Sequence, residues 1–338
     1  MNGPRKVSVV VPTRNGMPRF ADVLDGILTQ ETSWPFELLC VDTDSTDGTW
    51  EELERRGIRR RRIARSEFQH GRTRNAAIAE TDGDVVVLTV QDATPADPHW
   101  LSRLVGALDR ADDVAGAYGR QVPYEGFNPL LLRRLEQWSA GAVSPRLQRL
   151  PIGVRLTDLP PLERLSLCAF DDVSSCVRRD VWRRFPLPCR PFGEDVAWGK
   201  QVIEAGMAIA YAADSVVRHS HDDGALAEFE RIYQDHANLH DLFEILTVPT
   251  GRSAWTNARA QRRVYHRMLD ELSLPEGEDE RLRAFATRLA FAETFAQWLG
   301  ARSVRKGVGG GGPFAWIDRF VRGSNESNES RGEQGRGR

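Results

Sequence analysis

Short apolar runs alternate with amphipathic segments through the first third of the chain. Residues 7–11 form a β-branched run that is closed by Pro12, and residues 36–41 and 85–89 repeat this pattern. Such runs are typical of strands that are buried on both faces of a sheet. The arginine-rich residues 58–63 predict one further strand in the same series.

Between these runs the apolar period changes to that of a helix. Five apolar residues between positions 20 and 28 fall on one helical face. The pattern predicts three more helices, one carrying Trp50 and Leu53 and two over residues 73–79 and 99–108. This alternation predicts a mostly parallel α/β sheet that binds its ligands at the carboxyl ends of its strands. The polar residues expected along that edge are Thr13, Asp42, Asp44 and Asp92.

The second half of the pattern is less regular. Residues 114–122 predict a strand, residues 127–165 form a long insertion, and residues 173–177 and 208–212 predict two short elements with a loop and a helix between them. After His221 the apolar residues keep a helical spacing, at Leu226, Phe229, Ile232, Tyr233, Leu239 and Phe243. The predicted organisation is an α/β half over 1–122, a second half of the same domain over 123–223, a helical extension over 224–304, and a flexible Gly-rich and polar tail over 305–338.

Composition argues against a nucleic-acid partner. The chain of 338 residues has 46 Lys and Arg against 48 Asp and Glu, which gives a formal net charge of -2. Residues 55–65 are rich in arginine, but they lie within a predicted helix and strand and carry no interleaved aromatic residues. We therefore expect no binding of nucleic acid.

The four cysteines and the hydropathy pattern predict a cytoplasmic protein. The cysteines form no CxxC pair and lie in or beside apolar segments, which predicts buried free thiols in a reducing compartment. No run of about 18 apolar residues occurs, so no segment is expected to span a membrane. Peripheral contact with the inner face of the plasma membrane is left open, because the insertion either docks on a bilayer or packs on the domain through Leu130, Leu131, Leu135 and Trp138.

Nucleotide-binding glycine motifs are absent after the first predicted strand. The sequence there is PTRNGMPRF, which fits neither a dinucleotide fingerprint nor a P-loop. Asp42 follows the second strand directly, where its carboxylate could accept from a base N–H or a ribose hydroxyl. Asp44, Ser45 and Asp47 could instead cap the next helix, a role for which Asp42 comes too early.

Basic residues follow the third predicted strand. His70, Arg72 and Arg74 come just before a helix of small residues, where their donors could meet a phosphate or a base carbonyl. The alternative is a solvated basic loop.

Three separated features could form one cation site. Asp92 ends a predicted strand, Glu194 and Asp195 begin a helix, and His219 and His221 are two residues apart in a predicted extended segment. Residues two apart in a strand point the same way, so both imidazoles could face one site. Hard divalent cations prefer oxygen ligands, and imidazole suits Mn²⁺ better than Mg²⁺. One carboxylate, one imidazole, two diphosphate oxygens and water would complete such a site.

The ordered motifs resemble a known family. They are VSVVVPTRNG, VDTDSTDGT, FQHGRTRNAAIAETDGDVVVLTVQDATP, DDVSSCVRRDVW, FGEDVAWGKQVIEAG and HSHDD. In this order they are similar to the family 2 inverting glycosyltransferases of GT-A fold, and in detail to the bacterial rhamnosyltransferase branch. The resemblance covers about residues 6–223, and it implies a mostly parallel α/β sheet of GT-A type flanked by helices, with a C-terminal helical extension. It also implies that 1–122 is the nucleotide-sugar-binding half and 123–223 the acceptor-binding and catalytic half of this domain.

The resemblance implies roles for individual residues. Asp195 matches the catalytic base of the family's E-D motif, with Glu194 as its neighbour, and Asp92 matches the last acid of the metal motif. Thr89 and Gln91 stand where many relatives have acids. Asp42 would bind the nucleobase and Arg74 the base or the diphosphate. The implied nucleotide-sugar-binding set is Pro12, Thr13, Asp42, Asp44, His70, Arg74, Gln91 and Asp92, and the implied ligands of Mn²⁺ or Mg²⁺ are Asp92, His219 and His221.

The implied activity is a single-displacement transfer of a sugar, with L-rhamnose from dTDP-L-rhamnose as the expected donor and a glycan or lipid-linked molecule as the acceptor. The processive-synthase pattern Q-x-x-R-W is absent, which favours single transfer over polymer extrusion. Two alternatives stay open. The donor could be a UDP- or GDP-sugar, or the protein could bind a sugar nucleotide without catalysis, which Thr89 and Gln91 favour and the intact GED sequence opposes. The acceptor, the linkage and the oligomeric state are not defined by the sequence.

Overall fold

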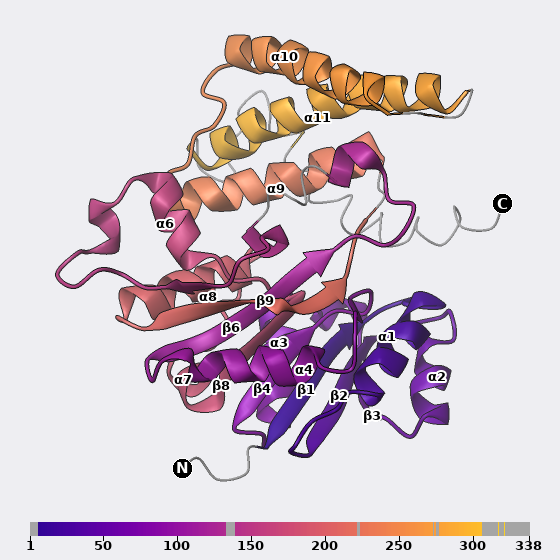
Figure 1. Cartoon of the computed structure of the whole chain (residues 1–338), viewed down its shortest axis with the longest axis vertical. Helices are drawn as coiled ribbons and strands as arrows, with labels where there is room; N and C mark the ends of the chain where they lie inside the picture. The colour runs from indigo at the N-terminus through magenta and orange to yellow at the C-terminus, as the bar shows by residue number, and fades with distance from the viewer. Residues whose placement is uncertain are drawn as a thin grey trace. The chain divides into compact units, whose positions relative to one another are not determined.

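The computed structural model describes residues 6–132, 139–221, 224–272, 274, 277–305, 317 and 321. The chain divides into two compact units, Met1–Asp222 and Asp223–Arg338. Figure 1 shows the strands gathered in the first unit and the long helices in the second. The first unit carries all the predicted site residues, so it is described first.

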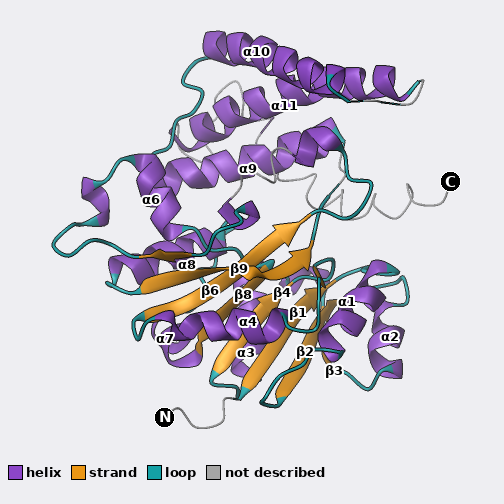
Figure 2. Cartoon of the chain, viewed as in Figure 1, coloured by secondary structure: helices purple, strands orange, loops and turns teal. Residues whose placement is uncertain are grey.

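Among the described residues of the first unit, nine strands form one mixed sheet at its centre (Figure 2). The strand order is β3-β2-β1-β4-β8-β6-β9-β5, and β7 pairs with β9 off this path. The strands are β1 Val7–Thr13, β2 Phe36–Thr43, β3 Arg59–Ile63, β4 Val85–Thr89, β5 Thr94–Pro95, β6 Val114–Val122, β7 Arg146–Gln148, β8 Ser174–Arg178 and β9 Ala208–Arg218.

The first four strands in the sheet order are parallel, as the alternating pattern predicts. The β1–β2 register sets Thr13 opposite Asp42, and the β2–β3 register sets Asp42 opposite Arg62. Because the carboxyl ends of parallel strands meet at one edge, these registers bring the polar residues that follow the strands together.

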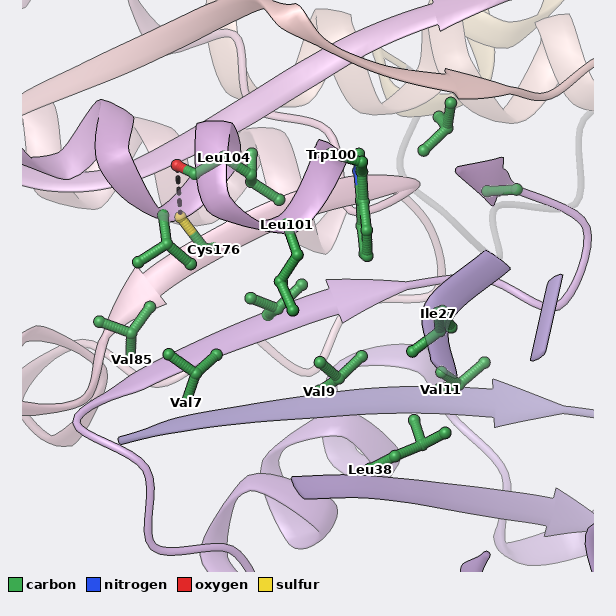
Figure 3. Packing of buried hydrophobic residues seen from close by; sticks show 14 of the residues in the cluster. Val7, Val9, Val11, Ile27, Leu38, Val85, Trp100, Leu101, Leu104 and Cys176 are labelled. Atoms are coloured by element: carbon green, nitrogen blue, oxygen red, sulfur yellow. Dashed lines mark hydrogen bonds between the residues drawn. The ribbon is translucent and has the colours of Figure 1, made fainter. Parts of the chain in front are cut away.

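Helices cover this sheet because their apolar faces match its valine-rich strands. In Figure 3, Trp100, Leu101 and Leu104 lie over Val7 and Val9, and Cys176 Sγ donates to the Leu104 carbonyl at 3.4 Å. The predicted apolar face of the first helix is buried at Phe20, Val23, Leu24 and Ile27, whereas Leu28 at its end is exposed. The helices are α1 Arg19–Leu28, α2 Thr49–Arg55, α3 His70–Ala79, α4 Trp100–Gly106, α6 Pro161–Cys168, α7 Arg179–Arg184 and α8 Glu194–Glu204, with 3-10 turns at Arg65–Glu67, Ala107–Arg110, Ser139–Gly141 and Leu156–Asp158.

The second half of the sheet departs from a parallel order. Strand β8 enters between β4 and β6 and runs antiparallel to both, and β5 and β7 run antiparallel to β9. Strand β9 is also longer than predicted, since it continues to Arg218. This extension places His219 next to the strand end, where its N–H donates to the Val122 carbonyl at 2.8 Å.

The second unit contains α9 Ala225–Phe243, α10 Gly251–Asp270 and α11 Glu278–Arg305. The predicted helical spacing after His221 is present, and Ile232, Tyr233, Leu239 and Phe243 are buried. Leu226, at the start of α9, is exposed. The predicted tail, 305–338, lies almost wholly outside the described residues.

Three predictions about surface and compartment can be compared with the structure. Within the residues that the structure describes, no helix is both long and apolar enough to cross a membrane. Leu130 and Leu131 of the insertion are buried, while Leu135 and Trp138 lie outside the described residues. The prediction of buried free thiols is right for Cys40, Cys168 and Cys176, but Cys189 is exposed because it lies in the proline-rich loop before α8.

Candidate functional site

Gln91 joins the ends of β1 and β4. Its Oε1 accepts from the Thr13 hydroxyl at 2.8 Å and from the Arg14 N–H at 2.6 Å. Thr89 is buried, and its hydroxyl donates to the Val173 carbonyl at 2.9 Å. The two residues that replace acids of the family pattern therefore have structural partners. Pro12, just before Thr13, is partly exposed at the same edge.

Asp42 presents a buried acceptor. Its side chain is fully buried, and its Oδ2 accepts from the Ser45 N–H and from Arg62 Nε, both at 3.2 Å. Its Oδ1 has no hydrogen-bond partner among the described residues. A buried carboxylate oxygen without a donor is costly, and a ligand N–H would satisfy it. Asp44 is exposed, with a positive φ of 49°.

The arginines of β3 are occupied by protein partners. Arg59 pairs with Glu37 at 3.0 Å, Arg60 pairs with Glu54, and the Arg62 guanidinium lies 4.4 Å from the centre of the Trp50 ring. These arginines therefore take part in ion pairs and a cation–π contact within the protein.

Asp92, His219 and His221 form a candidate cation site. His219 Nε2 lies 3.6 Å from Asp92 Oδ1, and His221 Nδ1 lies 3.8 Å from Asp92 Oδ2. One ligand atom from each residue lies within 4.8 Å of the others. A divalent ion bound at about 2.1 Å needs its ligands within about 4.2 Å of each other, so small side-chain movements suffice. The donor set of one carboxylate and two imidazoles fits Mn²⁺.

Arg74 lies at the centre of an acidic cluster. Its side chain is 4 % exposed, its Nη1 donates to Glu194 Oε1 at 2.6 Å, and its Nε lies 3.6 Å from Asp172 Oδ2. Asp171 and Asp195 act on the same guanidinium electrostatically. Arg74 thus fixes Glu194 within the protein, and its predicted role at the base or the diphosphate stays a prediction. We define Asp171, Asp172, Glu194 and Asp195 as the acidic cluster.

Burial and neighbouring acids raise the pKa of two members of the acidic cluster. Removal from water, and then the charges of Glu194 and Asp172, raise the pKa of Asp195 well above its ordinary value. Burial also raises the pKa of Asp172 to about 7, against the lowering effect of Arg74. A carboxylate with a raised pKa is a stronger base near neutral pH, which is what proton abstraction requires. His70 is half-exposed beside the cluster, with its Nδ1 3.9 Å from Glu194 Oε1.

Three residues of this region were not among the predicted site residues. Asp171 and Asp172 precede β8 in the DDVSSCVRRDVW motif, and Gln121 lies in β6. Gln121 Nε2 donates to Asp171 at 2.8 Å, and its Oε1 faces His219 Nδ1 at 3.0 Å. The cation site and the acidic cluster are therefore linked by direct contacts. The adjacent acids before a strand were the only sequence signal for this link.

Replacing Asp172 by asparagine should stabilise the protein at high pH. The folded protein holds a proton on Asp172 up to about pH 7, whereas the unfolded chain releases it near 3.8. The free energy of unfolding therefore falls as the pH rises between these values. An asparagine at position 172 binds no proton, so the variant does not undergo this decrease. Thermal melting at pH 8 should show a gain for Asp172→Asn of at most about 4 kcal/mol, at about 1.4 kcal/mol per pKa unit. The gain should vanish near pH 4, and equal melting curves at pH 8 would contradict the assignment.

The mixed sheet flanked by helices is a fold of GT-A type. Residues 8–155 match the family model described as Glycosyl transferase family 2. The chain is 30% identical over 233 residues to the O-antigen chain rhamnosyltransferase WbaN of Salmonella anatum, a match that covers 67% of this chain and 70% of that one. The chain belongs to glycosyl transferase family 2, and it is a glycosyltransferase.

Two further similarities were found. The O-antigen chain rhamnosyltransferase RfbN of Salmonella typhimurium is 29% identical over 233 residues, which cover 68% of this chain and 70% of that one. Among solved structures, the mannosyltransferase PcManGT from Pyrobaculum calidifontis, in complex with GDP-Man and Mn²⁺, aligns with 16% identity and a TM-score of 0.47, over 96% of this chain and 81% of that one.

Proposed function

We propose that the protein is an inverting rhamnosyltransferase, which moves L-rhamnose from dTDP-L-rhamnose to a glycan or lipid-linked acceptor by a single displacement. The observation that carries the proposal is Asp195, a carboxyl of raised pKa whose cluster contacts the candidate cation site through Gln121. In this assignment residues 1–122 bind the donor, residues 123–223 hold the acceptor and the base, and residues 224–304 are a helical extension.

The chemistry needs a base for the acceptor and positive charge for the leaving group. Asp195 takes the proton of the acceptor hydroxyl as that oxygen attacks the anomeric carbon from the face opposite the diphosphate. Arg74 holds Glu194 next to this base, and the Val196 N–H donates to Asp195 Oδ1 at 2.7 Å. Asp92, His219 and His221 would hold Mn²⁺ or Mg²⁺, which when bound stabilises the negative charge of the departing diphosphate.

Asp42 supports a nucleotide donor whose base carries a ring N–H. Its unpaired Oδ1 can accept the ring N–H of thymine, and Thr13 and Gln91 position the neighbouring strand end. Uracil and guanine also offer a ring N–H, so this contact alone does not distinguish dTDP-, UDP- and GDP-sugars. The two rhamnosyltransferases that the chain resembles support rhamnose.

A noncatalytic sugar-nucleotide-binding protein is the second candidate. Thr89 and Gln91 favour it, because neither can bind a cation as a carboxylate does. Asp195 argues against this candidate. Placing a carboxyl group out of water beside other carboxyl groups is energetically unfavourable, and nucleotide binding alone gives no reason for it.

Calorimetric titration with dTDP, UDP and GDP tests the donor assignment. We expect dTDP to bind tightest, and we expect Asp42→Asn to weaken dTDP binding by about 10- to 150-fold, since a hydrogen bond to a charged group is worth about 1.5–3 kcal/mol. In Asp42→Asn, the side-chain NH₂ group would face the ring N–H of the base, so two hydrogen-bond donors would oppose each other. Glu51→Gln in the exposed first turn of α2 is the matched control and should leave the affinity unchanged. Tighter binding of UDP or GDP would overturn the choice of dTDP.

A further inference from the structure

Gln121 joins the two halves of the candidate site through a buried amide. Its side chain is 5% exposed and lies on β6, beside the end of β9. The amide nitrogen donates to Asp171 Oδ2 at 2.8 Å, and the amide oxygen faces His219 Nδ1 at 3.0 Å. On the far side of the imidazole, Nε2 faces Asp92 at 3.6 Å. One line of contacts therefore runs from the acidic cluster to the cation site.

Asp171 fixes the orientation of this amide. A carboxyl oxygen of Asp171 accepts from Gln121 Nε2, so the NH₂ group of Gln121 points toward Asp171. The other carboxylate oxygen of Asp171 accepts from the Val173 N–H at 3.0 Å, which holds the carboxylate in place. The oxygen of Gln121 must then point toward His219.

The amide orientation in turn selects the tautomer of His219. A carbonyl oxygen only accepts, so His219 Nδ1 must carry the proton. The neutral ring then has its lone pair on Nε2, the atom that faces Asp92. Partners of this kind fix the tautomer and the ring orientation of histidines that bind metals.

We infer that Asp171 and Gln121 are positioning residues, which set His219 in the Nδ1–H tautomer and so prepare its Nε2 to bind a divalent cation. This inference rests on the proposed cation role of Asp92, His219 and His221. It gives the acidic cluster a second task, because Asp171 serves the cation site while Asp195 serves the acceptor.

Replacing Asp171 by asparagine reverses the chain of donors and acceptors without changing the size of the side chain. In Asp171→Asn, the oxygen of the new amide stays on the Val173 N–H, and its NH₂ group faces Gln121. The Gln121 amide must then turn over and donate to His219 Nδ1, which moves the imidazole proton to Nε2. A cation could no longer bind that nitrogen without displacing the proton.

The double variant Asp171→Asn, Gln121→Glu should restore the wild-type arrangement. A carboxylate at position 121 accepts both from the amide at position 171 and from Nδ1–H of His219. The carboxyl group moves from position 171 to position 121, and the number of acidic side chains is unchanged. Recovery in the double variant would separate positioning from a loss of packing.

The tautomer can be read directly in the metal-free protein by NMR of ¹⁵N-labelled histidine. The spectra are recorded about two pH units above the ordinary histidine pKa of about 6.5, so that the ring is neutral. The His219 signals are assigned by their loss in His219→Gln. We expect Nδ1–H in the wild type, Nε2–H in Asp171→Asn and Nδ1–H again in the double variant. A wild-type ring protonated on Nε2 would overturn the inference.

Mn²⁺ affinity, measured by calorimetry on the same proteins, gives the second readout. Loss of an orienting partner typically weakens metal affinity about 10- to 100-fold, so we expect that loss in Asp171→Asn and recovery in the double variant. Asp158→Asn is the matched control, because it removes an exposed carboxylate that pairs with Arg155, and it should not change the affinity. Unchanged affinity in Asp171→Asn, or no recovery in the double variant, would contradict the positioning role.

These readouts also separate this inference from the proposed function. Neither the tautomer nor the Mn²⁺ affinity depends on a donor sugar or on turnover. A wild-type protein with the Nδ1–H ring and bound Mn²⁺ that transfers no sugar would contradict the transferase assignment alone. A wild-type protein that binds no Mn²⁺ would contradict the cation role, whatever its tautomer.

Discussion

Asp195→Asn is expected to lower turnover by about 10²- to 10⁴-fold, the usual contribution of a general base. The amide keeps the size of the side chain but cannot take a proton from the acceptor hydroxyl. Burial and the carboxylates of Glu194 and Asp172 raise the pKa of Asp195, so wild-type kcat should rise with pH as this acid ionises. Binding of dTDP should persist in the variant, because no donor contact is assigned to this carboxyl.

The control for this variant lies on the same helix. Glu204 is at the other end of α8, where it pairs with Lys200 at 2.7 Å, so Glu204→Gln should turn over normally. Rates are compared at several pH values with dTDP-L-rhamnose as the donor, beside calorimetric titration of dTDP. The assignment of Asp195 as the base would be contradicted if Asp195→Asn turned over at a near-normal rate. It would also be contradicted if the variant lost dTDP binding in parallel.

Asp92→Ala is expected to weaken Mn²⁺ binding by more than about 100-fold, since the loss of a residue that only orients a ligand already costs about 10- to 100-fold. The carboxylate is the one anionic member of the candidate site, and both imidazoles face it. Nucleotide binding should weaken in the variant when Mn²⁺ is present. With a chelator, the variant and the wild type should bind dTDP equally.

Asp97→Ala is the matched control for Asp92→Ala. Asp97 lies in the same loop region, but it pairs with Arg103 at 2.7 Å instead of facing the two histidines. This control should bind Mn²⁺ as the wild type does. An equal loss of dTDP affinity in Asp92→Ala with and without chelator would show that Asp92 acts without a cation.

The order of strands and helices in the first half could be predicted because it depends on local patterns. The valine runs of β1 and β4 and the apolar face of α1 each bury themselves in the predicted way. Asp92 follows β4 and so reaches the predicted edge. Asp42 also reaches it, but it lies within β2, which is two residues longer than the predicted strand. The spacing of His219 and His221, two apart after the end of β9, predicts that both imidazoles face one side. Their contact with Asp92 depends on the long-range pairing of β5 with β9.

The second half could not be predicted from local patterns, because its pairing is made between segments far apart in the chain. The antiparallel entry of β8 between β4 and β6 brings Asp171 and Asp172 to Arg74. No periodicity of the sequence marks that contact. Gln91 is a similar case, because its contact with Thr13 appears only when β1 and β4 lie side by side.

The most direct test of the central claim is a competition between activated sugars. The protein is supplied with equal amounts of dTDP-L-rhamnose, UDP-glucose and GDP-mannose, with Mn²⁺ and a membrane extract as the source of acceptor, and the nucleoside diphosphates released are separated by chromatography. We predict that the wild type releases dTDP and that Asp195→Asn releases little of any. Release of UDP or GDP in place of dTDP, or equal release by Asp195→Asn, would contradict the account.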